Sequence, residues 1–275
     1  MTGLIDSTTG LAFGSGLQFQ TGIGGPGLGV SVGEAVFFNG GGTLFSDQLV
    51  GTPSPLFSMS MWINPRVSLL PGSRNKWNCF QSNAVNGVRP GGSTIFAEPG
   101  GGGPIFIYFC DATRANGVMW FGDDVTEMDE WFNILVSVDF SGGAAVMQCY
   151  FNDVLYEADI GFEDGTLPFN VDIFEETFYV QDWKLPGDTQ PSAQAMCDVW
   201  MAAGQFIDFS VEANRRKFIT ADGKRVDLGS TGLIPTGVAP TFFFTGGPDT
   251  FVNNVGTGGV FETAGDPLVI ADPPP

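Results

Sequence analysis

The sequence predicts an all-β fold, a β-sandwich made of many short antiparallel strands. Residues 132–138 alternate between apolar and other side chains with a period of two, which is typical of a strand packed on one face. Ser141–Gly143 interrupts this run, and a second strand is expected over residues 145–151. The pair Asn152–Asp153 predicts a tight hairpin turn into residues 154–158, because Asn and Asp tolerate positive φ angles.

Length and composition fit one large β domain or two small ones. The chain has 275 residues, and β-sandwiches often exceed about 200 residues. Its 40 glycines and 18 prolines suit many strands joined by turns, while 26 Phe and 6 Trp supply enough core material to argue against disorder. We expect a single jelly-roll sandwich over residues 34–271, followed by a Pro-rich tail over residues 272–275.

Charge and residue usage exclude several classes of function. A formal charge of −19 repels phosphate backbones and anionic lipids, so neither a nucleic acid nor a membrane is an expected partner. The absence of histidine excludes Ser-His-Asp and Cys-His catalysis and His-ligated zinc within the chain. Residues 1–30 have no Lys or Arg and no continuous apolar run, so they do not read as a secretory signal. No window of 18 apolar residues predicts a membrane-spanning helix.

Four cysteines, Cys79, Cys110, Cys149 and Cys197, lie far apart without Cys-x-x-Cys spacing. A zinc site is therefore not expected. Each cysteine sits in or beside an apolar run, which favours buried reduced thiols. Two disulfides remain the alternative in an oxidising compartment.

The first 33 residues differ from the rest of the chain. Glycine is too frequent there for a regular helix or strand, yet the segment is too apolar for a solvated linker. Its large apolar residues are Leu4, Ile5, Leu11, Phe13, Leu17, Phe19 and Ile23. We expect an extended arm whose apolar side chains dock on a neighbouring subunit; the alternative is an arm folded back on its own domain.

Further strands follow from apolar runs bounded by turn residues. They are expected at residues 35–38, 43–46, 56–63, 94–97, 104–109, 118–121, 177–183, 196–201, 240–245 and 259–262. Pro65 ends the strand at 56–63 because it lacks a backbone donor, and residues 66–93 read as loop. The segment 256–259 predicts a turn or bulge rather than a phosphate loop, since no Gly-Lys-Ser/Thr follows.

One short helix is expected near residues 210–218. Ser210 is the candidate N-cap, Glu212 lies in the first turn, and Arg215, Arg216 and Lys217 lie in the last, so the charges match the helix dipole. With Lys224 and Arg225 these residues form a basic cluster. It is either a solvated helix end or a surface that docks on an acidic neighbouring subunit.

Three segments together resemble the concanavalin A-like, laminin-G-like jelly roll. They are Val36–Leu44, which looks like its opening strand and turn, Phe57–Pro65, and the hairpin Trp131–Glu157. The region 196–265 is similar to the closing part of laminin-G-like proteins of tailed-bacteriophage structural modules.

The resemblance implies a non-enzymatic virion protein made in the host cytoplasm. The favoured role is a capsid decoration (cement) protein that clamps neighbouring subunits of the major capsid protein, as a homo-oligomer with a trimer favoured. A head-fibre or tail component is the nearest alternative. A glycan-binding module for host adsorption is the alternative from another class.

Catalysis and metal binding have weak support in the sequence. Glycoside hydrolases of this fold carry Glu-x-Asp-x-Glu or Glu-x-Asp-x-x-Glu on a strand, which places the carboxylates on one face. Here Glu127-Met-Asp129-Glu130 has Glu130 at the wrong parity and precedes the strand, so no enzyme activity is expected. No cofactor is expected, although Ca²⁺ at Asp123, Asp124 and Asp129 stays open on composition alone.

Tryptophans supply the last candidate contacts. Trp77, Trp120 and Trp183 are either core residues, as most strand tryptophans are, or surfaces on which sugar rings stack.

Overall fold

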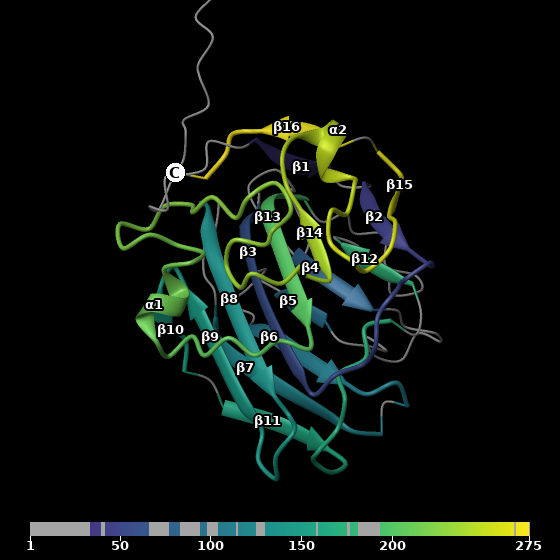
Figure 1. The fold of residues 1–275 in the computed structure, drawn as a ribbon, viewed down its shortest axis with the longest axis vertical. Coiled ribbons are helices and arrows are strands. Elements are labelled where there is room, and N and C mark those ends of the chain that lie inside the picture. Colours follow the sequence, from purple (N-terminus) through teal and green to yellow (C-terminus); the bar gives the residue numbers. More distant parts are fainter. Residues whose placement is uncertain are drawn as a thin grey trace, which may run out of the picture.

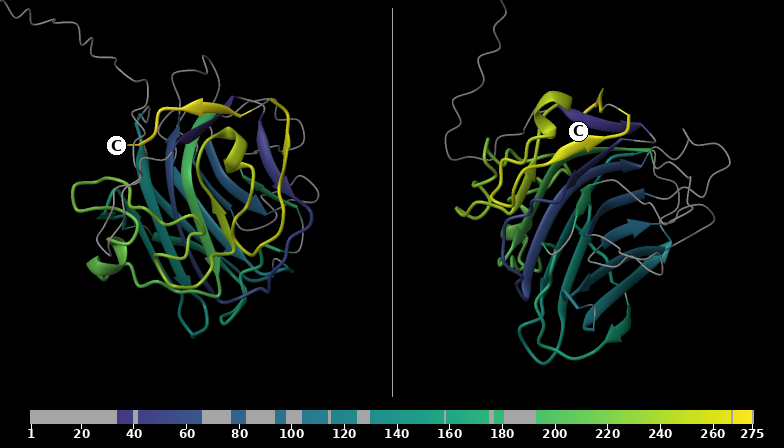
Figure 2. Two further views of the ribbon diagram at one scale, coloured as in Figure 1. Left: turned by 45° about the horizontal axis from the view of Figure 1, so that its top comes forward. Right: turned by 90° about the vertical axis from the view of Figure 1, so that its right-hand side faces the viewer.

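Two eight-stranded antiparallel sheets, packed face to face, form the molecule (Figures 1 and 2). The structure is a computed structural model and describes residues 34–39, 42–65, 77–82, 94–97, 104–113, 115–124, 130–157, 159–174, 177–180, 193–266 and 268–274. The expected arm over residues 1–33, including its seven large apolar residues, lies outside this description. Two one-turn helices, α1 (Glu212–Arg215) and α2 (Pro248–Phe251), complete the secondary structure of the described residues. The prediction of an all-β sandwich is confirmed.

The first sheet, sheet A, has the strand order β10-β9-β8-β3-β13-β1-β16, with β14 paired to β13. Its strands are β1 (Ala35–Asn39), β3 (Leu56–Pro65), β8 (Phe132–Asp139), β9 (Val146–Phe151), β10 (Val154–Leu155), β13 (Ala193–Ala203), β14 (Phe242–Phe244) and β16 (Val269–Ala271).

The second sheet, sheet B, has the order β11-β7-β6-β5-β4-β12-β2-β15. Its strands are β2 (Thr43–Ser46), β4 (Trp77–Ser82), β5 (Thr94–Ala97), β6 (Pro104–Cys110), β7 (Gly117–Asp124), β11 (Asp159–Asp164), β12 (Phe178–Val180) and β15 (Glu262–Ala264).

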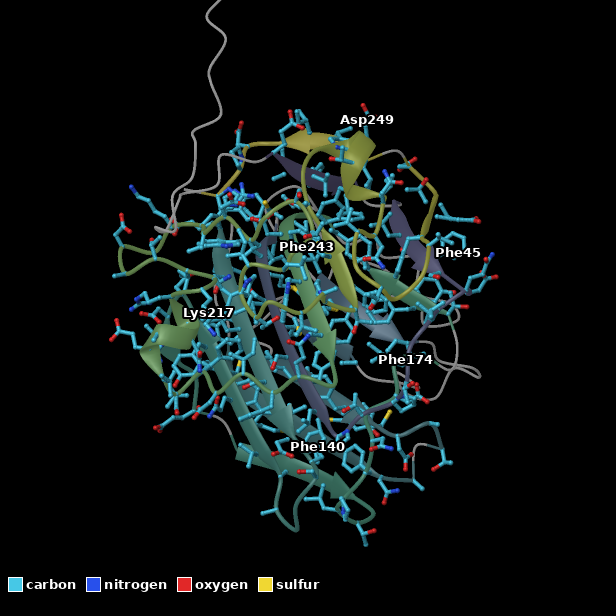
Figure 3. All side chains as sticks on the ribbon, in the orientation of Figure 1. Phe45, Phe140, Phe174, Lys217, Phe243 and Asp249 are labelled. Atoms are coloured by element: carbon cyan, nitrogen blue, oxygen red, sulfur yellow. The ribbon has the colours of Figure 1, made fainter. Side chains whose placement is uncertain are left out.

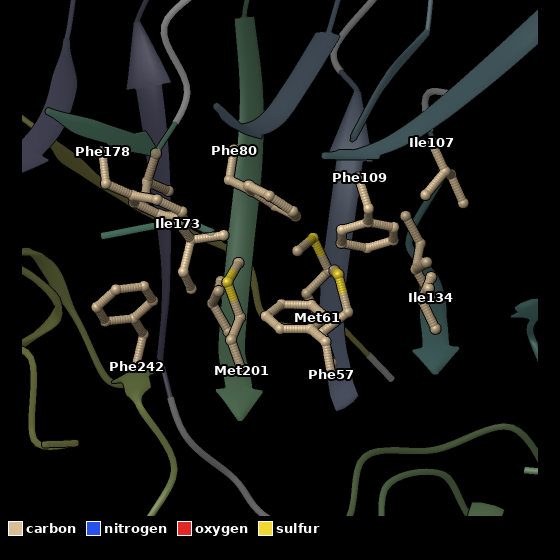
Figure 4. Close-up of a cluster of buried hydrophobic side chains, with 14 of the residues drawn as sticks. Phe57, Met61, Phe80, Ile107, Phe109, Ile134, Ile173, Phe178, Met201 and Phe242 are labelled. Atoms are coloured by element: carbon tan, nitrogen blue, oxygen red, sulfur yellow. The ribbon is translucent and has the colours of Figure 1, made fainter. Parts of the chain in front are cut away.

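The main core lies between the two sheets. Period-two alternation in β3 directs Met59, Met61 and Ile63 into it, and all three are completely buried. Sheet B contributes rings from its inward positions, such as Phe80 and Phe178, which stack with centroids 5.4 Å apart. Figure 4 shows Met61, Phe80 and Phe178 among the side chains that meet between the sheets.

A second core lies on the other face of sheet A. Trp62, Leu135 and Trp200 point outward from their strands and pack against the segment 204–240, which crosses this face. The right-hand view of Figure 2 shows this segment on the side of sheet A opposite sheet B. The expectation that residues 132–138 pack on one face is therefore wrong, because the covering segment buries both faces of β8.

The hairpin turn is confirmed. Asn152 and Asp153 have φ angles of 47° and 69°, and they join β9 to β10. The turn at 256–259 is also confirmed, because the amide of Gly256 donates to Asn254 Oδ1 at 2.9 Å and Gly259 has φ of 108°.

Some elements differ from the sequence-based expectation. The loop expected over 66–93 contains β4, and β11 and β16 were not expected at all. The helix near 210–218 is only one turn long, and Ser210 does not cap it. Instead the Ser210 hydroxyl donates to Asp208 Oδ1 at 2.6 Å, so Ser210 stabilises a turn before the helix rather than capping the helix.

Candidate functional site

In the described part of the chain, the segment 204–240 covers the outer face of sheet A. It leaves the outer face of sheet B open, and this face is the candidate binding surface. In β6, Ile107 and Phe109 are completely buried in the main core. Phe106 and Tyr108 occupy the alternate, outward positions and are half-buried. The same parity in β2 and β12 turns Leu44 and Phe178 inward and leaves Phe45 and Tyr179 on the outer face.

Strand register aligns these outward positions in one row across the whole sheet. Following the pairings from β15 to β11, the row is Glu262, Phe45, Tyr179, Gln81, Thr94, Tyr108, Met119 and Phe162. Eight strands with a spacing of about 4.8 Å give this cross-strand row a length of roughly 34 Å.

Two aromatic positions stand at one end of the cross-strand row. Phe45 and Tyr179 face each other on paired strands, with ring centroids 6.3 Å apart and planes inclined by 30°. Figure 3 shows Phe45 at the side of the molecule opposite Lys217 of the covering segment. The two rings form an apolar platform that carries one hydroxyl group, a combination suited to contacts that are partly apolar and partly hydrogen-bonded.

A third aromatic position lies three strands further along, at Tyr108. A Cβ atom on Gly117, in the neighbouring strand β7, would lie 2.5 Å from the Tyr108 hydroxyl oxygen. Only glycine leaves room for the ring here, so Gly117 sets how Tyr108 lies on the sheet. Met119, its cross-strand partner, is half-buried beside it.

The cross-strand row is almost uncharged in a chain of formal charge −19. Glu262 at its end is the one carboxylate among the eight residues. Across the described ranges, every Lys and Arg lies at 215–217 or 224–225, in the segment that covers sheet A. The described side chains of the row thus offer rings and two phenol hydroxyl groups, which suit a neutral polar ligand.

The basic cluster is engaged within the chain. Arg215 and Arg216 both donate to the Asp153 carboxylate in the β9–β10 turn, and Arg215 also lies 4.6 Å from the centre of the Tyr150 ring. Burial acts to raise the pKa of Asp153, but the hydrogen bonds from Arg216 and Arg215 outweigh it and lower the pKa. The docking role expected for Arg215, Arg216 and Lys217 stays a prediction.

Arg225, the last member of the cluster, is buried rather than displayed. It is 0% exposed and donates to Asp198 Oδ2 from Nε at 2.9 Å and from Nη2 at 2.6 Å. Thr245 donates to the other carboxylate oxygen of Asp198 at 2.6 Å. This buried ion pair fastens the covering segment to β13, so Arg225 has a structural role.

The acidic candidates fall mostly outside the described residues. Glu127 and Asp129 do so, as do the side chains of Asp123 and Asp124 at the end of β7, while Glu130 is exposed just before β8. No group of three or more His, Cys, Asp or Glu that could hold a metal ion occurs among the residues whose positions are described. The predictions on catalysis and Ca²⁺ remain predictions.

The described thiols are buried and reduced. Cys110, Cys149 and Cys197 form no disulfide, as expected, while the side chain of Cys79 lies outside the description. Burial raises the pKa of Cys197 well above its usual value, and the neighbouring Asp198 carboxylate acts in the same direction.

Trp120 is a core residue, 5% exposed, with its ring edge-on to Tyr156 at 5.3 Å. Trp183 and the Trp77 side chain lie outside the description. The sequence interpretation concentrated on tryptophans and missed Phe45, Tyr108 and Tyr179. Alternation along each strand places these three residues opposite the core-facing positions, but only the register aligns them.

Within the described part of the chain, no helix has the length and hydropathy needed to cross a bilayer.

Comparisons with known proteins place the fold. No protein-family model matches the chain, and no curated protein sequence matches it. A solved structure from Bacteroides ovatus, described as a candidate carbohydrate-binding protein, is 13% identical with a TM-score of 0.52, over 87% of this chain and 59% of that one.

Two other solved structures have lower TM-scores. The heptameric SAP-like pentraxin of Limulus polyphemus is 11% identical with a TM-score of 0.47, over 88% of this chain and 96% of that one. The botulinum neurotoxin serotype D binding domain is 13% identical with a TM-score of 0.44, over 73% of this chain and 48% of that one. At 13% identity, the match to the Bacteroides ovatus structure concerns the fold alone: the chain is a two-sheet antiparallel β-sandwich of the jelly-roll type.

Proposed function

We propose that the protein binds a neutral glycan through the outer face of sheet B. The observation that carries this proposal is the cross-strand row, in which the aromatic positions Phe45, Tyr179 and Tyr108 bring rings and two phenol hydroxyl groups onto one face of the sheet. Sugar rings present apolar C–H faces and polar edges, and such a row matches both. The Bacteroides ovatus protein with the same fold, described as carbohydrate-binding, supports the proposal.

Substitutions at two aromatic positions of the row test it. Full-length protein is screened on an array of neutral and acidic glycans, and a neutral hit is then titrated by calorimetry. Tyr179→Ala and Tyr108→Ala are each expected to weaken binding about tenfold, a loss of about 1.4 kcal/mol. Gly117→Ala should also weaken it, because the added methyl group displaces the Tyr108 ring.

The matched control is Phe206→Ala. Phe206 is another half-buried aromatic residue, but it lies in the segment that covers sheet A. It should leave the affinity unchanged, and the melting temperature of each variant reports whether it is folded. Binding of no glycan at all, or an equal loss in Phe206→Ala, would contradict the proposal.

We also propose that the chain does not hydrolyse the glycan. The acidic segment 127–130 precedes β8 rather than lying within a strand, so the paired-carboxylate geometry of a glycosidase is not expected there. Incubation with β-glucans or alginate-like polymers should release no reducing ends. Hydrolysis that disappears in Glu127→Gln would show the opposite.

A structural role in a virion, foremost as a capsid decoration protein, stays a second proposal. It comes from the sequence resemblance, and what supports a subunit-contact function is the set of aliphatic side chains left on the surface. Ile234, Val238 and Ile270 are 62%, 57% and 64% exposed. Cryo-electron microscopy of particles made with and without this protein would test the role directly.

A further inference from the structure

Sheet A ends in an apolar edge at β16. This strand pairs with β1 on one side, and no strand pairs with its other side in the described part of the chain. Val269 and Ile270 are 43% and 64% exposed. An edge strand presents unpaired backbone groups that can accept another strand, and proteins usually protect such an edge with charged residues or proline. Within Val269–Ala271 neither is present.

Strand β16 is also held in position by its neighbours, and one of its faces extends the main core. Ile270 pairs with Val36, which is completely buried between the sheets, so Ile270 lies on the core side at the rim of the sandwich. Directly after β16, the carbonyl of Asp272 accepts a hydrogen bond of 3.1 Å from the Trp131 side chain. A strand added here would pair with β16, which β1 and Trp131 already hold in position, and it would cover Ile270.

The chain itself contains a segment that fits this edge. Residues 17–23 read Leu-Gln-Phe-Gln-Thr-Gly-Ile, with large apolar residues at positions 17, 19 and 23 and glutamines between them. This is the alternation of a strand with one buried face. Residues 7–33 carry no charge although the chain has a formal charge of −19, so repulsion does not oppose docking.

The connection to β1 decides which copy supplies the segment. Residues 24–33 contain five glycines and one proline and lead into β1, which lies inside β16 in the sheet. Antiparallel pairing with β16 of the same chain would make the arm parallel to β1. That arrangement requires a crossover of a dozen or more residues, usually a helix. An arm from another copy faces no such requirement.

We propose that residues 17–23 of one copy add as a strand to β16 of a second copy. The large apolar side chains of the segment then lie on the same face of the sheet as Ile270, and the glutamines lie on the same face as Ala271. Each copy both donates and receives an arm, and a reciprocal exchange between two copies closes as a twofold-symmetric dimer. This inference concerns self-assembly and does not depend on the proposed glycan-binding function.

Cross-linking of full-length chains tests the pairing. Two differently tagged populations, one carrying Gln20→Cys and one carrying Ala271→Cys, are mixed, allowed to exchange and oxidised. We expect a disulfide-linked species that contains both tags and is absent from the mixed wild-type proteins. Gln18→Cys replaces Gln20→Cys in a parallel experiment to cover the other register. A link that forms only within one chain of the Gln20→Cys, Ala271→Cys double variant, or no link in either register, overturns the proposal.

A charge at the edge provides the second measurement. Ile270→Lys should convert the oligomer to monomer in size-exclusion chromatography with light scattering. Val154→Lys is the matched control, because Val154 is 68% exposed and lies on β10 at the opposite edge of the same sheet. It should leave the oligomer intact. A wild-type protein that is monomeric at all concentrations, or an oligomer that survives Ile270→Lys, contradicts the proposal.

Discussion

Asp198 and Arg225 are the most deeply buried charged residues described. Asp198 has a φ of 47° and sits where the register between β13 and β3 shifts, so a bulge in the strand turns its carboxylate toward Arg225. A buried pair of this kind adds little net stability over an apolar pair, but removing one partner leaves the other charge unpaired. Its role is to fix where the covering segment attaches.

Removing Asp198 should therefore be costly. Asp198→Ala is expected to lower the free energy of unfolding by about 3–5 kcal/mol, since Arg225 stays buried without a partner. Denaturant titration measures the loss. The control is Asp222→Ala, which removes the exposed partner of Lys224 and should leave the midpoint unchanged. Equal effects of the two variants would show that Asp198 does not hold the covering segment.

The Asp153 carboxylate predicts a pH dependence. Its pKa is lower in the folded protein than in the unfolded chain, so its contribution to stability is present above about pH 3.9 and is lost as the pH falls through the folded value. Asp153→Asn keeps a residue that tolerates the φ of 69°. At pH 7 the variant should be less stable than the wild type by about 1 kcal/mol, and the difference should shrink toward pH 2. Thermal unfolding at several pH values checks this; a difference that is constant with pH would rule out the ionised pair as its source.

At the scale of elements, the segment 204–240 behaves as a third layer although it contains little regular structure. Phe218 is 1% exposed and packs edge-on against Trp200 and Phe209, at 5.2 Å and 5.8 Å between ring centres. The Trp200 side chain donates to the carbonyl of Gly232 at 2.9 Å. Aromatic packing and side-chain hydrogen bonds thus replace the strand pairing that a sheet would provide.

This layer should be part of the cooperative core. Phe218→Ala is expected to lower the free energy of unfolding by about 3–5 kcal/mol, as large-to-small substitutions in a core do. Ile234→Ala, at a site 62% exposed in the same segment, should change it by less than about 0.5 kcal/mol. Urea titration compares the two. If the variants are alike, the segment is only a surface loop.

At the scale of the whole molecule, the described residues from Glu34 onward supply two large hydrophobic cores. We therefore expect that deleting residues 2–33 leaves the sandwich folded, with nearly unchanged melting temperature at low concentration. Differential scanning calorimetry measures this. Failure of the truncated chain to fold would show that the arm belongs to the core of its own domain.

Much of the fold could be predicted because β-strands have a local signature. The alternation in 56–63 predicts that Met59, Met61 and Ile63 share one face of the strand and that the serines lie on the other. In the structure the three apolar residues lie in the main core, and Ser58 and Ser60 are not part of it. The Asn152–Asp153 turn was readable because the positive φ angles it needs restrict the residue types. By contrast β16 has three residues, too few to show a period, and β4 sits in a stretch that reads as loop.

What the sequence by itself determined is which residues share a face of a strand, where turns occur, and that the chain is all-β. What only the tertiary structure decided is which strands are neighbours and which faces are covered. Phe45 and Tyr179 are far apart in the chain, and nothing local states that β2 pairs with β12. The burial of both faces of sheet A depends on a segment some 70 residues beyond β8 in the chain. Alternation is a property of one strand, whereas the cross-strand row and the open edge at β16 arise from register and packing between distant segments.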